Sequence, residues 1–363
     1  MTGEWMTVCM ETAKVLEKQA IVLDIGAFNV KLGFSDVRKS KPDYILKTSH
    51  LTDITLDQRL PAPEYEKCCG TYNCSFDEIS SESLVQFVEK HLHANPEEHP
   101  VLLVESFLTE RKCRNRKLQV VFEELGASAF ALSNEALLSL YSTGRTTGVV
   151  VESGYSKSYC CAIHEGISPP YAYATMHCNS GRSTAKITEN LMEVESCKYT
   201  SQCAGDDKSV LQDAMSFMEN NGKISVDPSS SSSSDIGYEI GEALFGKFKA
   251  QSSKAIHTAV EEAIYNADEM EDYNHFYYEN IVLSGGNTLY PGLKERLELE
   301  LEKTKVDKDA KQVSVIAAAN RQFSSWIGGS IVASLPTFKH RWITKEDYRE
   351  SGSNIFHSKC LPY

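Results

Sequence analysis

The stretch Ala20-Ile21-Val22-Leu23-Asp24-Ile25-Gly26 is a run of apolar residues that ends in a carboxylate and a glycine. Such a run is typical of a buried strand that enters a tight turn. A similar run recurs much further along the chain, at Gly148-Val149-Val150-Val151-Glu152-Ser153-Gly154. Two apolar strands that each end in acid-x-Gly indicate an internal duplication.

A third glycine turn follows another apolar run, at Asn280-Ile281-Val282-Leu283-Ser284-Gly285-Gly286, and a helix is expected from Tyr290 onward. Glycine lets the backbone approach a phosphate closely, and an acid beside it can hold a metal ion or a water molecule. One such turn is weak evidence. Three in this order, each behind a predicted buried strand, make a strong constellation.

The composition of the 363 residues narrows the choice of partners. A net charge of −13 argues against nucleic acid or an anionic membrane as the main partner, because phosphate binding needs basic patches. No apolar run reaches the ~18 residues that would span a bilayer, and residues 1–20 have no secretory pattern. We therefore expect the eleven cysteines to be reduced thiols in the cytoplasm or the nucleus.

Three other segments have local patterns. Residues 1–20 have apolar positions close to helical spacing, which fits either a short amphipathic arm or a frayed terminus. The serines at 229–234 predict a flexible loop. The basic segment Arg111 to Lys117 is interpreted as the solvated face of a helix, because apolar residues supply an opposite face at Leu118, Val121, Phe122 and Leu125.

Four blocks of sequence together resemble the actin and actin-related protein family. They are Pro96 to Leu103, Leu138 to Gly148, Ser284-Gly285-Gly286, and Ser324 to Leu335 followed by Lys359-Cys360. The similarity runs from about Ile21 to Cys360. It implies two lobes, each built on a duplicated β-sheet core, with ATP and a divalent cation between them.

The resemblance gives an expected fold class and domain plan. The class is α/β with an actin-like ATPase fold, whose two lobes have duplicated RNase H-like mixed sheets and whose second and fourth subdomains are reduced. The plan has an N-terminal extension (1–20), a first lobe (21–142 and 324–363, with a shortened second subdomain near 46–72) and a second lobe (143–323, with a reduced fourth subdomain near 179–253).

The resemblance also implies which residues bind ATP or ADP with magnesium. The positions that match the family's nucleotide contacts are Asp24, Gly26, Lys31, Gly154, Gly181, Asp213, Gly285, Gly286 and Tyr290. Asp24 and Glu152 would hold the metal through its water shell. Glu135 stands where the family has a glutamine beside the attacking water, and a glutamate can orient or deprotonate water.

Several positions depart from the family pattern on the nucleotide side. In the first turn, Ala27 replaces a serine and Phe28 replaces a glycine. In the second turn, Glu152 replaces one aspartate and Tyr155 another, while Tyr159 replaces the histidine that positions water. Two lysines are replaced by glutamine, at Gln212 and Gln322. These changes predict weak or static nucleotide binding.

The partner-facing positions are better preserved than the nucleotide site. In the family a cleft between the first and third subdomains receives amphipathic helices from binding proteins. Its positions map here to Tyr141, Gly144, Thr146, Gly166, Ile327, Ile331, Val332, Leu335 and Thr337. Arg341 replaces an apolar residue at the rim, which would narrow the choice of partner. Core packing is the alternative explanation for these apolar residues.

The leading hypothesis is a structural, interaction-based subunit of a cytoskeletal assembly, capping or scaffolding rather than polymerising. The segment between Phe34 and Pro96 is shorter than the family norm, as a filament-end cap would need, and the actin-related subunit at the pointed end of dynactin is the nearest example. One alternative is a polymerising actin-like ATPase. Another is a nuclear actin-related subunit of a chromatin-remodelling complex. A sugar kinase would leave the C-terminal block unexplained.

Overall fold

The computed structural model describes residues 16–48, 81–106, 109, 111–176, 224, 241–246, 254–267, 274–305, 312–355 and 359. The chain divides into two compact units, which are unit 1 (1–144 and 323–363) and unit 2 (145–322). The predicted N-terminal arm, the shortened second subdomain, the serine tract and the fourth subdomain lie largely or wholly outside the described residues.

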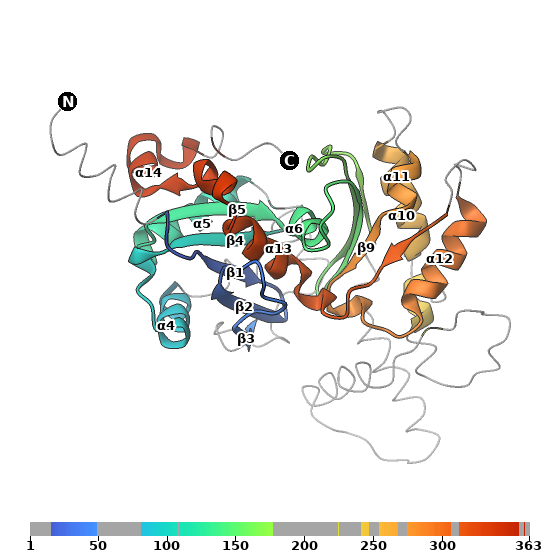
Figure 1. Ribbon diagram of the computed structural model, residues 1–363, viewed down its shortest axis with the longest axis horizontal. Helices are drawn as coiled ribbons and strands as arrows, with labels where there is room; N and C mark the ends of the chain where they lie inside the picture. The colour runs from blue at the N-terminus through green and yellow to red at the C-terminus, as the bar shows by residue number, and fades with distance from the viewer. Residues whose placement is uncertain are drawn as a thin grey trace, which may run out of the picture. The chain divides into compact units, whose positions relative to one another are not determined.

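Unit 1 contains a mixed sheet with the strand order β11-β5-β4-β1-β2-β3 (Figure 1). Strands β1, β2 and β3 are antiparallel neighbours, while β4 and β5 run parallel to β1. The strands are β1 (Ile21–Ile25), β2 (Asn29–Phe34), β3 (Tyr44–Lys47), β4 (Pro100–Glu105), β5 (Ala129–Asn134) and β11 (Ile343–Thr344). The apolar run at the start of the chain is thus a fully buried strand, as predicted.

The two faces of this sheet are covered by different helices because side chains alternate along each strand. Ile21 and Leu23 point into a cluster with α4 (Ser81–Leu92), α5 (Arg111–Gln119) and the π-helical turn η4 (Val120–Glu124). Val22 points into a second cluster with α6 (Glu135–Tyr141) and α13 (Ser324–Ala333), where Trp326 Nε1 donates to Val22 O at 3.0 Å.

Helix α13 crosses α6 with their backbones in close approach. A Cβ atom on Gly328 would lie 1.8 Å from Leu138 O, so only glycine fits there. The remaining elements of unit 1 are η3 (Pro96–Glu98), η8 (Pro336–Arg341), α14 (Lys345–Ser351) and η9 (Gly352–Asn354). The short turn η7 (Arg321–Phe323) begins in unit 2 and ends at the first residue of unit 1's returning segment.

The prediction that Arg111 to Lys117 forms a solvated helix face is wrong at Lys117. This side chain is 2% exposed and its Nζ lies 3.0 Å from Glu105 Oε1. Arg114 Nε donates to the other oxygen of Glu105 at 2.7 Å. The reason is that β4 ends in a buried carboxylate beneath α5, and a buried charge needs ion partners. The apolar face of the helix is buried as predicted, at Leu118, Val121, Phe122 and Leu125.

Unit 2 contains a second mixed sheet with the strand order β10-β9-β6-β7-β8. Its strands are β6 (Gly148–Ser153), β7 (Ser158–Ile163), β8 (Tyr173–Thr175), β9 (Ile281–Ser284) and β10 (Val315–Ile316). Strands β6, β7 and β8 are antiparallel neighbours, and β9 and β10 continue the sheet parallel to β6. The order β8-β7-β6-β9-β10 therefore repeats the order β3-β2-β1-β4-β5 of unit 1. The predicted duplication and the α/β class of fold are therefore confirmed.

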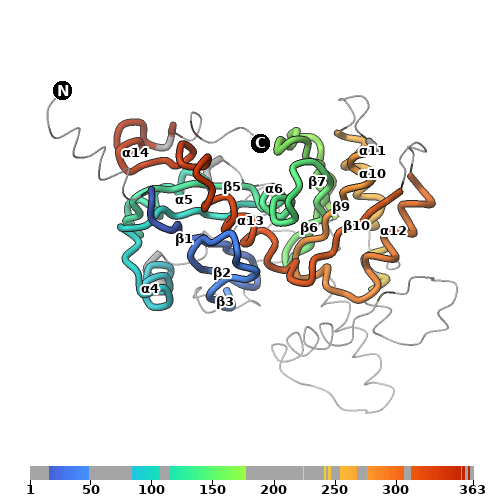
Figure 2. The backbone as a smooth tube through the Cα atoms, viewed as in Figure 1, coloured from blue at the N-terminus to red at the C-terminus, as the bar shows by residue number. Residues whose placement is uncertain are grey.

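Helices cover one face of the second sheet, where Val149, Val151, Cys160 and Ala162 join their core. Elements of unit 2 outside the sheet are η5 (Ala243–Phe245), α10 (Ile256–Ala267), α11 (Asn274–Tyr278), η6 (Gly286–Thr288) and α12 (Leu293–Thr304). Figure 2 follows the backbone through both sheets in chain order.

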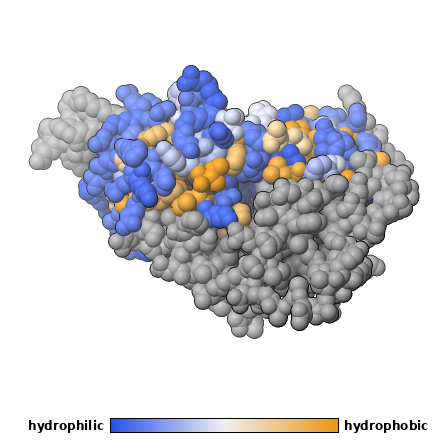
Figure 3. Space-filling model, turned by 90° about the horizontal axis from the view of Figure 1, so that it is seen from below, coloured by the Kyte–Doolittle hydropathy of each residue, from blue (hydrophilic) through white to orange (hydrophobic). Residues whose placement is uncertain are grey.

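On the face drawn in Figure 3, hydrophobic residues reach the surface in separate groups among hydrophilic ones. Within the part of the chain that the structure describes, none of the helices is both long and apolar enough to cross a membrane.

Candidate functional site

The first glycine turn (24–28) closes the hairpin of β1 and β2. Asp24, the penultimate residue of β1, is 5% exposed and lies directly across from Lys31 of β2. Lys31 Nζ lies 2.6 Å from Asp24 Oδ2, and Ser325 Oγ donates to the same oxygen at 2.8 Å. The carboxylate is thus fixed both from its own hairpin and from the start of α13.

The backbone of this turn is held from two sides. Gly26 N–H donates to Asn29 O at 3.0 Å, and Thr48 Oγ1 donates to Gly26 O at 2.7 Å. A Cβ atom on Gly26 would lie 2.9 Å from Asn29 O, which explains the glycine. Phe28 is half-buried, with Lys47 Nζ 5.8 Å from the centre of its ring. An aromatic ring therefore belongs to the turn itself.

Glu135 lies at the same edge of the sheet as Asp24. Strands β1, β4 and β5 run parallel, and Asp24 pairs in register with Val104, which pairs with Ser133. Glu135 is the first residue of α6, after Asn134, whose Oδ1 accepts from Ala136 N and Leu137 N at 2.7 and 3.3 Å. The structure thus brings three sequence-predicted residues, Asp24, Lys31 and Glu135, to one edge of unit 1.

The second glycine turn (152–155) and the third (284–288) meet within unit 2. Glu152 of β6 pairs in register with Ser284 of β9. Gly285 has φ of +90°, and a Cβ atom there would lie 2.2 Å from Ser153 O and 2.9 Å from Glu152 Oε1. Only glycine allows the Glu152 carboxylate to lie this close to the third turn. Gly154 N–H closes the second turn on Lys157 O at 2.9 Å.

Glu152 is almost completely buried by its neighbours, so little of its carboxylate is accessible to solvent or to a ligand. The carboxylate is 7% exposed, and its register partner on β7 is the fully buried Tyr159. By contrast, Gly286 is exposed, and no atom of the described residues lies within 4 Å of the place where its Cβ would be. Tyr290 is buried in the core of unit 2. The open backbone at Gly286 is the part of the third turn that a ligand could approach.

Arg321 holds the third glycine turn and was not expected from the sequence. Its guanidinium donates to Thr288 O at 2.7 Å, to Thr288 Oγ1 at 3.1 Å and to Ala318 O at 3.0 Å. Its own carbonyl accepts from Gly285 N at 3.1 Å. Burial lowers the pKa of Arg321. Ser325 was also missed, because no local pattern links it to an acid near the start of the chain.

The predicted partner cleft has members in both units. In unit 1, Ile327 and Val332 belong to the core beside α6, Ile331 is half-buried, and Leu335 and Thr337 are exposed. Gly144 is exposed at the end of unit 1, and Tyr141 is half-buried. Burial raises the pKa of Tyr141, and the charge of Arg341 acts in the opposite direction. In unit 2, Gly166 N–H donates to Thr146 O at 2.8 Å.

Two predicted nucleotide contacts, Gly181 and Asp213, lie outside the described residues, as does Gln212. Among the residues that are described, no three His, Cys, Asp or Glu side chains gather as a metal-binding group. Asp24 of unit 1 and Glu152 of unit 2 are each a buried carboxylate, and carboxylate oxygen is a ligand type that magnesium prefers.

Two α/β units, each with a mixed sheet whose carboxyl edge carries acid and glycine turns, define the class of actin-like folds. The family model described as Actin matches residues 77–229 and 224–361. The chain therefore belongs to the actin family. Members of this family generally bind a nucleotide with magnesium. The first glycine turn precedes the matched residues, whereas the second and third turns lie within them.

Proposed function

We propose that this chain is a divergent actin-related protein that serves as a structural subunit of a cytoskeletal assembly in the cytoplasm. It caps or scaffolds filaments rather than polymerising, and it binds ATP weakly or without turnover. Its partners are other actin-fold proteins and actin-binding proteins.

The observation that carries the nucleotide part of this proposal is the ion pair in the first glycine turn. Lys31 is the one cation matched to the family's phosphate contacts, and it already forms an ion pair with Asp24. Ser325 donates a hydrogen bond to the same carboxylate. A phosphate would compete with Asp24 for the ammonium group. If that competition costs ~1.5–3 kcal/mol, affinity falls roughly 10- to 200-fold. The ring of Phe28, in place of a glycine, further restricts access to the turn backbone.

The residues present fit a nucleotide with magnesium. In unit 2, Gly286 offers open backbone, Gly154 completes the second turn and Glu152 provides a carboxylate of the type that a hydrated magnesium ion prefers. In unit 1, Asp24 provides a carboxylate of the same type. A bound magnesium ion would neutralise phosphate charge there. Glu135 is the candidate for any residual hydrolysis, because it follows β5 at the same sheet edge as Asp24.

The partner side of the proposal draws on α13 and the segment after it. Ile331 is half-buried and Leu335 is 41% exposed, so this end of α13 presents apolar surface to water. Arg341, close enough to influence Tyr141, would favour a partner helix that carries an acid at its rim. An amphipathic helix fits a surface of this kind.

The first test measures the nucleotide content of the purified protein after denaturation, by anion-exchange chromatography. ATP retained without conversion supports static binding. Near-stoichiometric ADP would favour the alternative of a cycling ATPase with Glu135, Asp24 and Glu152 in the active site. A well-folded protein that releases no nucleotide would overturn the proposal that the chain binds ATP. Lys31→Met should lower ATP retention, whereas Lys90→Met, at an exposed lysine of α4, should not.

A second test addresses capping. Substoichiometric protein added to growing actin filaments should slow elongation, and the protein alone should not sediment in salt and magnesium. Leu335→Asp should abolish the slowing, whereas Leu299→Asp, at a similarly exposed leucine of α12, should leave it intact. Sedimentation of the protein alone, or equal effects of the two variants, would overturn the capping proposal.

A further inference from the structure

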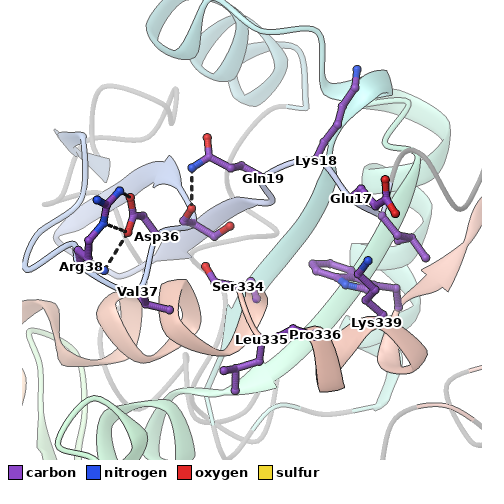
Figure 4. Close-up of a pocket in the computed structure, with 14 residues that line it drawn as sticks. Glu17, Lys18, Gln19, Asp36, Val37, Arg38, Ser334, Leu335, Pro336 and Lys339 are labelled. Carbon is purple, nitrogen blue, oxygen red and sulfur yellow. Dashed lines mark hydrogen bonds and ion pairs between the residues drawn. The ribbon is translucent and has the colours of Figure 1, made fainter.

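A groove of about 620 Å³ lies within unit 1, away from the glycine turns. Three stretches line it, which are 16–19 before β1, 35–38 after β2, and 333–342 from the end of α13 through η8. In Figure 4 the residues before β1 run along one side of the groove, and Ser334, Leu335 and Pro336 lie on the opposite side. We call it the N-terminal groove. It shares only Leu335 with the predicted partner cleft.

The surface of the N-terminal groove is apolar in the middle. Val37 is 53% exposed and Leu335 is 41% exposed, although both are large hydrophobic side chains. Leu16, Pro336 and the indole of the buried Trp342 complete the apolar lining. Grouped apolar side chains left open to water mark a surface that binds another segment.

The rim of the groove is charged, with the acids Glu17 and Asp36 and the bases Lys18, Arg38 and Lys339 among its lining residues. Asp36 pairs with Arg38 at 2.9 Å, and the Arg38 side chain is 87% exposed. Lys18 pairs with Glu98 at 2.7 Å. Lys339 is exposed, and no ion pair joins it to an acid in the described ranges. An occupant with carboxylates would therefore meet cations at this rim, on a chain whose net charge is −13.

Residues 1–15 are the segment best placed to fill this groove, because they continue directly from Leu16, which lines it. Their sequence has apolar residues at Trp5, Val8 and Val15, at spacings that place them on one face of a helix, with acids at Glu4 and Glu11. A tether of this length gives a millimolar effective concentration, so even a weak contact would be occupied most of the time.

We infer that residues 1–15 fold back onto the N-terminal groove of their own chain. Their apolar residues cover Val37 and Leu335, and their acids face Lys339 and Arg38. The inference does not rest on the proposed function. If the partner cleft is as proposed, the arm also covers one of its edges, at Leu335, and a partner must displace it there.

Hydrogen exchange read by mass spectrometry tests the inference on the full chain and on a chain that begins at residue 16. Removing the arm should accelerate exchange in 333–342 by about 10-fold, the change expected when a mostly closed contact is lost. Exchange in 149–163 of unit 2 should stay the same. The shortened chain keeps the bond from Gln19 Nε2 to Ser35 O, so its melting temperature should fall by only a few degrees, as the loss of one weak contact predicts. A synthetic peptide of residues 1–15, added in excess, should restore protection.

Matched substitutions separate a docked arm from other occupants. In the full chain, Val37→Asp and Lys339→Glu should each mimic the deletion. Ile45→Asp and Lys41→Glu, at exposed positions outside the groove, should not. Equal exchange in the full and shortened chains would overturn the inference. So would protection that grows with protein concentration, because it would show that a second copy fills the groove.

Discussion

At the scale of single residues, the buried charges at the end of β4 show how strongly one side chain depends on its partners. Glu105 is 1% exposed and contacts both Lys117 Nζ and Arg114 Nε. Removing water from a carboxylate is costly unless ion partners and hydrogen bonds replace it. The triad therefore couples the helix α5 to the edge of the sheet.

Replacing Lys117 with methionine should lower the free energy of unfolding by about 3 kcal/mol, because it leaves a buried carboxylate with a weakened set of partners. The matched control is Arg116→Met. Its pair with Glu124 has an arginine side chain that is 46% exposed, so the loss there should stay below about 1 kcal/mol. Urea titration followed by circular dichroism measures both variants. Equal losses would contradict the assignment of a buried triad.

Adjacent glycines of the third turn offer a second prediction. Gly285→Ala should cost at least about 2 kcal/mol of stability, because φ is +90° and the new Cβ would meet Ser153 O at 2.2 Å. Gly286→Ala should leave stability nearly unchanged, since its Cβ would meet no atom of the described part of the chain within 4 Å. If Gly286 contacts a nucleotide as proposed, the second variant should still lose retained ATP. Thermal unfolding and nucleotide content distinguish the two effects.

At the scale of secondary-structure elements, the strands and glycine turns could be predicted because their signal is local. The apolar run before Asp24 and the glycine after it describe a strand and its turn without any distant contact. Burial of Lys117 could not be predicted, because a helical pattern reveals a polar face but not the acid beneath it. The bond from Ser325 to Asp24 joins residues 301 positions apart, which no local pattern encodes.

Helix α10 of unit 2 provides a prediction about pH. His257 lies on this helix with its ring stacked 6.2 Å from that of Phe245, and no described residue bonds its buried Nδ1. Burial lowers the pKa of His257 from its ordinary value of 6.5. Charged groups act on it in both directions: Glu300 and Glu261 raise the pKa, and Arg296 and Lys303 lower it.

The sign of the effect follows from the lowered pKa. The folded chain prefers the neutral ring, whereas the unfolded chain takes up a proton near the ordinary value. The contribution of the neutral His257 ring to the free energy of unfolding is therefore fully present above about pH 6.5 and is lost as the pH falls below that value. The urea concentration at the midpoint of unfolding should decrease as the pH is lowered from about 7.5 to about 5.5. The decrease should be smaller in His257→Phe. His340→Phe, at an exposed histidine of η8, should keep the full dependence.

At the scale of the whole molecule, the chain leaves unit 1 after Gly144 and returns to it at Phe323. Unit 1 depends on this return, because Trp326 is fully buried against Val22 and β11 pairs with β5 as the edge strand of the sheet. Near the C-terminus, Lys359 Nζ contacts Asp347 and donates to Trp342 O at 3.1 Å. Unit 2 is continuous, and its sheet and helices form a core of their own.

Ending the chain after Gln322 should therefore prevent unit 1 from folding, because one face of its sheet would lose α13 and open its core to water. Residues 145–322 expressed alone should unfold cooperatively in urea, since their hydrophobic cluster is complete within that segment. The complementary chain joins residue 144 to residue 323 through a short glycine-serine linker and should also unfold cooperatively. A broad, non-cooperative transition for residues 145–322, beside a cooperative one for the intact protein, would show that the units fold only together.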